Sequence, residues 1–228
     1  MILIIIGLLL VFAIIYGPQY WVSRVLRYYS AEQEHYPGTG GELAEHLVKV
    51  LKLDDVKVEQ TEEGDHYDPR DKVVRLSEQN MQGKSLTAIT VAAHEVGHAI
   101  QHQQGYAPFK MRQRLVGLAY GAEKLGAFMM FAVPFLALLT RSPHVGLTMI
   151  VIGLGSMLVG TIVHLSTLPV EFDASFNRAL PILLKGQYIS EPEHEHAKKI
   201  LTAAALTYVS ASLASLLNLA RWFAILRR

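Results

Sequence analysis

The sequence predicts a mainly α-helical, multi-pass membrane protein that carries one small α+β domain. Only 18% of its 228 residues are charged, against roughly 25% in soluble proteins. Four apolar segments each approach the length of about 20 residues that crosses a bilayer as a helix. The first is separated from the other three by a polar stretch, residues 23–114. The formal net charge of +1 gives no basic excess for nucleic acid, so we expect no nucleic-acid partner.

The first apolar segment predicts an N-terminal transmembrane helix over residues 1–22. Arg24 and Arg27 follow this segment instead of preceding it, which favours an uncleaved anchor over a signal peptide. The lipid bilayer is then an expected partner. Residues 115–228 are expected to form a membrane bundle, with spans at about 119–139, 145–168 and 201–220.

Lysine and arginine predict which loops face the cytoplasm. Residues 23–114 hold 12 of them, residues 140–144 hold one and residues 169–200 hold four. Because positive loops stay on the cytoplasmic side, both longer segments are expected there. The segment at 201–220 breaks this pattern, since a full span would place the C-terminal arginines outside; a re-entrant or surface helix is the alternative.

The polar stretch predicts a small domain of two helices and a hairpin. Thr39 is a candidate N-cap for the first helix and Ser85 for the second, which is expected to run to Gln104 before Gly105. Between them, two β-like runs at residues 56–60 and 72–77 flank a charged turn.

The second helix contains the sequence HEVGH, which is typical of zinc sites. His94 and His98 lie four positions apart, so both face one side of a helix and can bind one Zn²⁺ per chain. Glu95 would then lie beside the zinc-bound water. The alternative, two surface histidines without a metal, fits poorly with a helix and a glutamate at this spacing.

A catalytic zinc site needs a third protein ligand and an open position. His102 would lie roughly 12 Å along the helix from His94, too far to share a tetrahedral ion. Glu123 is beside Lys124, which favours an interfacial ion pair. Glu171 is the better candidate, because two crossings of the membrane return it to the side of HEVGH. Asp173 is expected to orient a ligating imidazole; a simple helix-end charge is the alternative.

These residues predict a zinc metalloendopeptidase that hydrolyses peptide bonds, with Glu95 activating the zinc-bound water. Glu171 lies close to the end of a predicted span, so juxtamembrane or membrane-protein segments are the expected substrates. The strand around Val74, Arg75 and Leu76 is a candidate edge for pairing with an extended substrate, or else only a structural edge. The sequence does not choose among five candidate donors to the oxyanion or substrate: His66, Tyr67, Tyr106, His164 and Arg178.

Three sequence stretches carry a family resemblance: GDHYDPRDKVVRLSEQN, SLTAITVAAHEVGHAIQHQQGY and LPVEFDASFNRAL. Together they resemble the YugP-type family of bacterial membrane zinc metallopeptidases, from about Tyr16 to the C-terminus. The resemblance implies a zincin-like domain on the cytoplasmic side of the bacterial membrane and a gluzincin-like site. In it, His94, His98 and Glu171 match the zinc ligands and Glu95 the catalytic glutamate.

A more distant similarity is to HtpX and CAAX-prenyl-type membrane zinc proteases, which share the HExxH motif and an ExxxD motif downstream. Ser175 stands at that aspartate position here. A competing hypothesis is a non-catalytic membrane scaffold that zinc merely stabilises, but such a site needs no general base and uses four protein ligands. Oligomerisation is possible and not indicated. The His194-Glu195-His196 cluster is expected to be an exposed charge cluster that opens the last helix.

Overall fold

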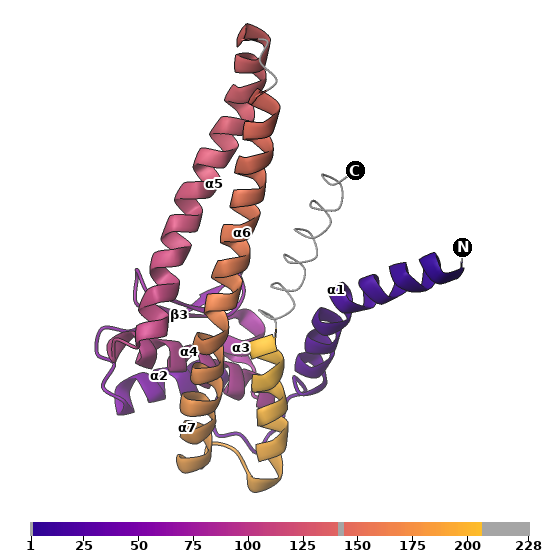
Figure 1. The fold of residues 1–228 in the computed structure, drawn as a ribbon. Coiled ribbons are helices and arrows are strands. Elements are labelled where there is room, and N and C mark those ends of the chain that lie inside the picture. The colour runs from indigo at the N-terminus through magenta and orange to yellow at the C-terminus, as the bar shows by residue number, and fades with distance from the viewer. Residues whose placement is uncertain (1, 141–143, 207–228) are drawn as a thin grey trace.

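The computed structural model describes residues 2–140 and 144–206, in a mainly helical arrangement with one small sheet (Figure 1). The elements, in chain order, are α1 (Ile2–Tyr28), α2 (Gly40–Val50), β1 (Lys57–Thr61), β2 (His66–Asp68), β3 (Val73–Ser77), α3 (Glu78–Gln82), α4 (Leu86–Gln103), α5 (Ala107–Thr140), α6 (His144–Phe172), the π-helix η1 (Asp173–Ala179), α7 (Leu180–Lys185) and the 3₁₀-helix η2 (Glu191–Glu193). Residues 194–206 form a further helix after η2.

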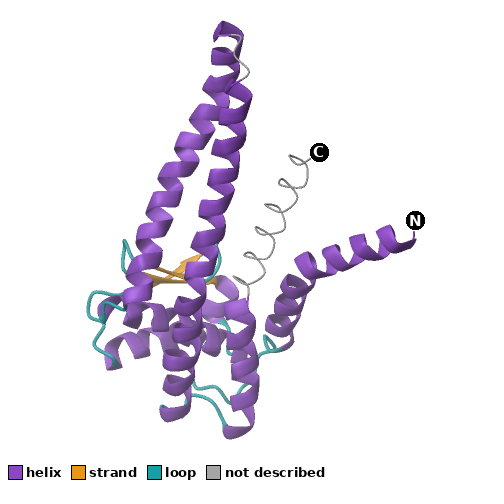
Figure 2. Ribbon diagram, viewed as in Figure 1, coloured by secondary structure: helices purple, strands orange, loops and turns teal. Residues whose placement is uncertain are grey.

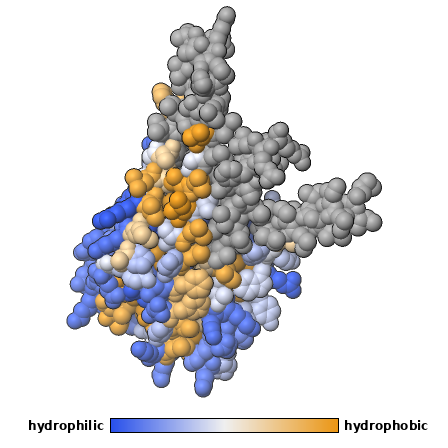
Figure 3. Space-filling view, in the orientation of Figure 1, coloured by the Kyte–Doolittle hydropathy of each residue, from blue (hydrophilic) through white to orange (hydrophobic). Residues whose placement is uncertain are grey.

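Two long helices, α5 and α6, lie side by side and project from a compact part, while α1 leaves it in another direction (Figure 1). The compact part contains the shorter helices and the sheet, drawn in orange in Figure 2. Figure 3 shows hydrophilic residues over much of the compact part and an apolar band that continues from the long helices. The site described below lies where these two parts meet.

Side-chain caps fix where the two helices of the polar stretch begin. Thr39 Oγ1 accepts a hydrogen bond from the Glu42 amide, and the Glu42 carboxylate accepts one from the Thr39 amide, which completes a capping box on α2. Ser85 accepts a bond from the Ala88 amide at the start of α4. Gly105 ends α4 with φ of +64°, a conformation that glycine adopts without strain. The capping residues predicted from the sequence are therefore confirmed.

The sheet corrects two predictions. Its strand order is β1-β3-β2, with β3 in the centre: β1 pairs with it in parallel, and β2 pairs with it antiparallel. The expected hairpin of residues 56–60 and 72–77 is wrong, because the charged turn between them itself contains β2. The substrate-pairing edge at Val74, Arg75 and Leu76 is also wrong, since hydrogen bonds to strands on both sides leave β3 no open edge.

The membrane prediction is also corrected. Among the described residues, no helix is both long enough and apolar enough to cross a membrane. A spanning helix requires about 20 consecutive, predominantly apolar residues, and helix length alone does not meet that requirement. α5, for example, begins well before the expected span and includes Lys110, Arg112 and Arg114. The expectation of a multi-pass helical membrane protein is therefore wrong.

The orientation argument depended on those spans, so it no longer has a basis. Of the expected span at 201–220, residues 201–206 continue a helix and residues 207–220 lie outside the described part of the chain. The expected division into residues 1–22, 23–114 and 115–228 stays a prediction.

The core of the compact part is built around α4. Every residue from Leu86 to Gln101 is buried, as expected for a helix surrounded by other elements. α2 and α3 pack on α4 from the first half of the chain, and η1 and α7 pack on it from the second half. Gly97 lets η1 approach closely: a Cβ there would lie 2.9 Å from the Ala174 carbonyl oxygen.

We expect Gly97→Ala to lower the free energy of unfolding by about 1–3 kcal/mol, because α4 and η1 would have to move apart. Gly117→Ala on exposed α5 is the matched control, since nothing lies within 4 Å of the added Cβ. There alanine should be neutral or stabilise by up to about 1 kcal/mol. Urea unfolding followed by circular dichroism measures both, and equal midpoints for the two variants would contradict the close contact.

Candidate metal centre

Three buried side chains from two distant parts of the chain converge on one point. His94 and His98 lie one turn apart on α4, and Glu171 lies in the last turn of α6. Glu171 Oε2 is 3.2 Å from His94 Nε2 and 3.3 Å from His98 Nε2. One ligand atom from each residue lies within 4.8 Å of the others. All three are almost fully enclosed, with exposed fractions of 4%, 5% and 1%.

The second ring nitrogen of each histidine is held by a neighbouring side chain. Ser175 Oγ is 3.1 Å from His94 Nδ1, and Gln101 Oε1 is 3.0 Å from His98 Nδ1. These contacts turn the Nε2 atoms of both rings toward Glu171. An outer partner of this kind fixes ring orientation and tautomer in metal-binding histidines.

Gln101 connects α4 to the chain that follows Glu171. Its Nε2 donates to the Val170 carbonyl oxygen and to Asp173 Oδ2, both at 2.8 Å. Asp173 also accepts a bond from Arg178 Nε at 2.6 Å. Asp173 was expected to contact an imidazole; in the structure it acts one step further out, through Gln101, and Ser175 makes the direct contact to His94.

The two buried glutamates of the site have opposite pKa shifts. Burial raises the pKa of Glu95 to about 7; the nearby carboxylates Glu171 and Asp65 add to the increase, while His94 and Arg112 oppose it. Burial would also raise the pKa of Glu171, but interactions with His98 and His94 outweigh it and hold that pKa well below its usual range. Glu171 is therefore an anion across the physiological range, while Glu95 can both accept and release a proton near neutrality.

The convergent side chains fit a zinc ion. Two imidazole nitrogens and one carboxylate oxygen form a donor set common in catalytic zinc sites, which keep a further position open. Glu171 Oε1 is buried and has no hydrogen-bond partner within the described chain. The Arg112 guanidinium is 3.7 Å from it, longer than a hydrogen bond. A metal ion would satisfy this cluster of buried polar atoms.

A cavity of about 200 Å³ opens onto the cluster. His66 and Tyr67 of β2 line it together with Glu95, so two of the five candidate donors reach the site. The remaining three candidates do not line it: Tyr106 lies under the Arg178 guanidinium, which bonds Asp173 and Gln104, and His164 lies two turns before Glu171 on α6. The side chain of Glu123 lies outside the part of the chain that the structure describes.

Sequence reasoning missed three residues of this site: Gln101, Ser175 and Arg112. Ser175 lies four residues after Glu171, which puts both on similar faces of a helix, so this spacing was an available signal. Gln101 lies three residues after His98 and offered the same signal. Nothing in the sequence pairs Arg112 with Glu171, because that contact depends on how α5 docks.

A HEVGH helix with a glutamate from a second helix beside both histidines defines the class of the protein: a zinc-peptidase-type metal centre. Comparison with known proteins agrees. The family model described as "Putative neutral zinc metallopeptidase" matches residues 2–227, and the chain belongs to this family. It is 38% identical over 211 residues to the "Putative membrane protease YugP" of Bacillus subtilis, which covers 91% of this chain and 89% of that protein. No solved structure matches.

We expect Gln101→Leu to weaken zinc binding by about 10- to 100-fold, the usual effect of removing an outer partner of a metal ligand. The change frees His98 Nδ1 and leaves the Val170 carbonyl without its donor. Gln103→Leu is the matched control, because Gln103 is exposed and its amide bonds only the Lys52 carbonyl oxygen. Competition with a chromogenic zinc chelator gives both affinities; equal values would contradict the role of Gln101.

Proposed function

We propose that the chain is a zinc-dependent endopeptidase of gluzincin type, with His94, His98 and Glu171 as zinc ligands and Glu95 as general base. The observation that carries this proposal is the place of Glu95. It is buried, lines the same small cavity as the three convergent side chains, and precedes His98 by less than one helical turn. A site that only stabilised the fold would have no use for a buried carboxylate beside an open position.

A zinc ion held by these residues would lower the pKa of a water toward about 7 and polarise the carbonyl of the scissile bond. Glu95 takes the proton as water oxygen bonds to the carbonyl carbon, and returns it to the amine nitrogen as the carbon–nitrogen bond breaks. Of the remaining side chains in the cavity, Tyr67 and Arg112 can donate to the oxyanion.

A peptide is the substrate that the surroundings of the cavity favour. β2 is an edge strand of the sheet, and its residues His66 and Tyr67 line the cavity. An extended peptide added along the free edge of β2 would bring its backbone beside Glu95 and the zinc ligands. The substrate-pairing edge therefore belongs to β2 and not to β3.

We expect Glu95→Gln to retain zinc and lose at least 10³-fold in the rate of peptide hydrolysis, because the amide cannot accept the proton. Glu171→Ala should lose zinc affinity as well as activity. Glu45→Gln, on the exposed side of α2, is the control for removal of a carboxylate. Zinc content by mass spectrometry and cleavage of quenched peptides separate the two effects. A wild-type protein that holds zinc but cleaves nothing would instead support the non-catalytic scaffold.

We further propose that its substrates include polypeptide segments at a lipid bilayer. Two observations support this: the relative from Bacillus subtilis carries the name membrane protease, and large apolar side chains are exposed on the long helices. Leu118 and Phe128 of α5 are 67% and 65% exposed, and Val151 of α6 is 62% exposed. Exposed apolar patches mark interaction sites for proteins or membranes.

Cleavage of a membrane-anchored reporter in liposomes should therefore exceed cleavage of labelled casein, about tenfold or more, since the lipid surface concentrates enzyme and substrate together. The same reporter segment attached to a soluble carrier is the control. Equal rates for the anchored and the soluble form would contradict the bilayer as a partner.

A further inference from the structure

A second cavity adjoins the metal site. Its volume is about 380 Å³, and it shares Tyr67 and Arg112 with the cavity that contains Glu95. A substrate side chain that occupied this second cavity would thus belong to a residue next to the bond being cut. The walls come from the β2–β3 connection, α4 and the start of α5.

The charges around this second cavity are predominantly positive. Arg70 and Arg112 both line it. Arg70 is exposed, and its guanidinium forms no ion pair with another residue in the described part of the chain. Lys72 and Lys110 lie close enough that, after burial, they are the causes that lower the pKa of His102 in the same wall.

The single carboxylate in the wall, Asp68, is already occupied. Its Oδ2 accepts a bond from Arg75 at 2.8 Å, and its Oδ1 accepts bonds from the Arg70 and Asp71 amides at 2.8 and 3.4 Å. Asp68 therefore neutralises Arg75, outside the cavity lining, and leaves the Arg70 guanidinium available for an anion, while Arg112 keeps its contact with Glu171.

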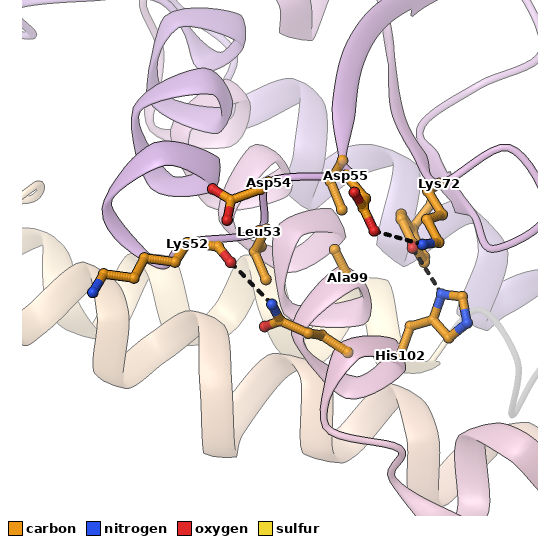
Figure 4. A pocket seen from close by; sticks show the side chains of 10 residues that line it. Lys52, Leu53, Asp54, Asp55, Lys72, Ala99 and His102 are labelled. Carbon is orange, nitrogen blue, oxygen red and sulfur yellow. Dashed lines mark hydrogen bonds and ion pairs between the residues drawn. The ribbon is translucent and has the colours of Figure 1, made fainter.

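The walls are otherwise apolar and aromatic, with Phe109, Val116 and the Tyr67 ring. A third cavity of about 410 Å³ continues beyond the Tyr67–His102 hydrogen bond of 2.9 Å. Figure 4 shows this third cavity, in which Lys72 is paired with Asp55 at 2.8 Å. Tyr67 lines all three cavities.

We propose that the second cavity is a specificity subsite in which Arg70 binds a substrate carboxylate next to the scissile bond. The inference rests on the proposed peptidase function. A carboxylate adjacent to the bond comes either from an aspartate or glutamate side chain or from the C-terminus of a peptide, and the apolar walls fit the methylene groups of glutamate.

The test uses quenched peptides that differ only in glutamate or glutamine at each position around the cleaved bond, each with a free or an amidated C-terminus. Wild-type protein should prefer glutamate at one position by about tenfold in kcat/KM, the size expected for a hydrogen bond to a charged group. A preference that follows the free C-terminus instead assigns the subsite to that carboxylate. Equal rates across all the peptides would overturn the proposal.

Arg70→Gln should remove most of this preference, and Arg70→Glu should reverse it in favour of glutamine. Arg114→Gln is the matched control, because Arg114 is an exposed arginine on α5 that lines none of these cavities, and its preference should equal that of wild type. Arg112 is left unchanged, since it contacts Glu171. An Arg70→Gln preference equal to that of Arg114→Gln would overturn the role of Arg70.

A measurement of peptide binding, without cleavage, tests this inference separately from the proposed function. The zinc-loaded Glu95→Gln protein should bind the glutamate peptide about tenfold more tightly than the glutamine peptide by fluorescence anisotropy, whether or not wild type cleaves either. Loss of cleavage with this binding preference intact would contradict the peptidase and keep the subsite. Cleavage without any preference for glutamate would keep the peptidase and contradict the subsite.

Discussion

The metal centre depends on one buried amide, Gln101, which fixes how α4 meets the end of α6. It is completely enclosed and bonds three groups at once: the His98 ring, the Val170 carbonyl and Asp173. A buried amide that lost these partners would leave unpaired polar atoms, at a cost of about 1–3 kcal/mol each. This requirement holds the segment around Glu171 at one place against the helix, and that segment also carries Ser175, which contacts His94.

The change of helix type after α6 belongs to the same arrangement. The chain widens into the π-helix η1 directly after Phe172, one residue beyond Glu171. Short π-helical turns are rare and frequent at functional sites. Here three side chains within five consecutive residues contact α4: Glu171, Asp173 and Ser175. The close packing at Gly97 brings this segment near enough for such short side chains to reach.

Local signals in the sequence were sufficient for the parts that depend on neighbouring residues. Caps at Thr39 and Ser85 and the HEVGH spacing follow from helix geometry. Glu171 was chosen from two membrane crossings that the structure does not support; it reaches α4 because α5 and α6 pack side by side and return the chain. Contacts between distant elements, such as Arg112 with Glu171, left no local pattern. The edge strand was misplaced because β2 has only three residues and lies inside a turn-like charged sequence. For α5, the expected span left out Lys110, Arg112 and Arg114, which belong to the same helix.

The distance between the ligands along the chain has a consequence for the order in which the protein is made. His98 and Glu171 are 73 positions apart, from 171 minus 98. At about 5–20 residues per second, roughly 4–15 seconds of translation separate them. During that interval the growing chain holds the two histidines and Glu95 but neither the third ligand nor Ser175. A chain that ends before Glu171 lacks one of the three convergent side chains, so the complete cluster forms only once the second half of the chain has emerged.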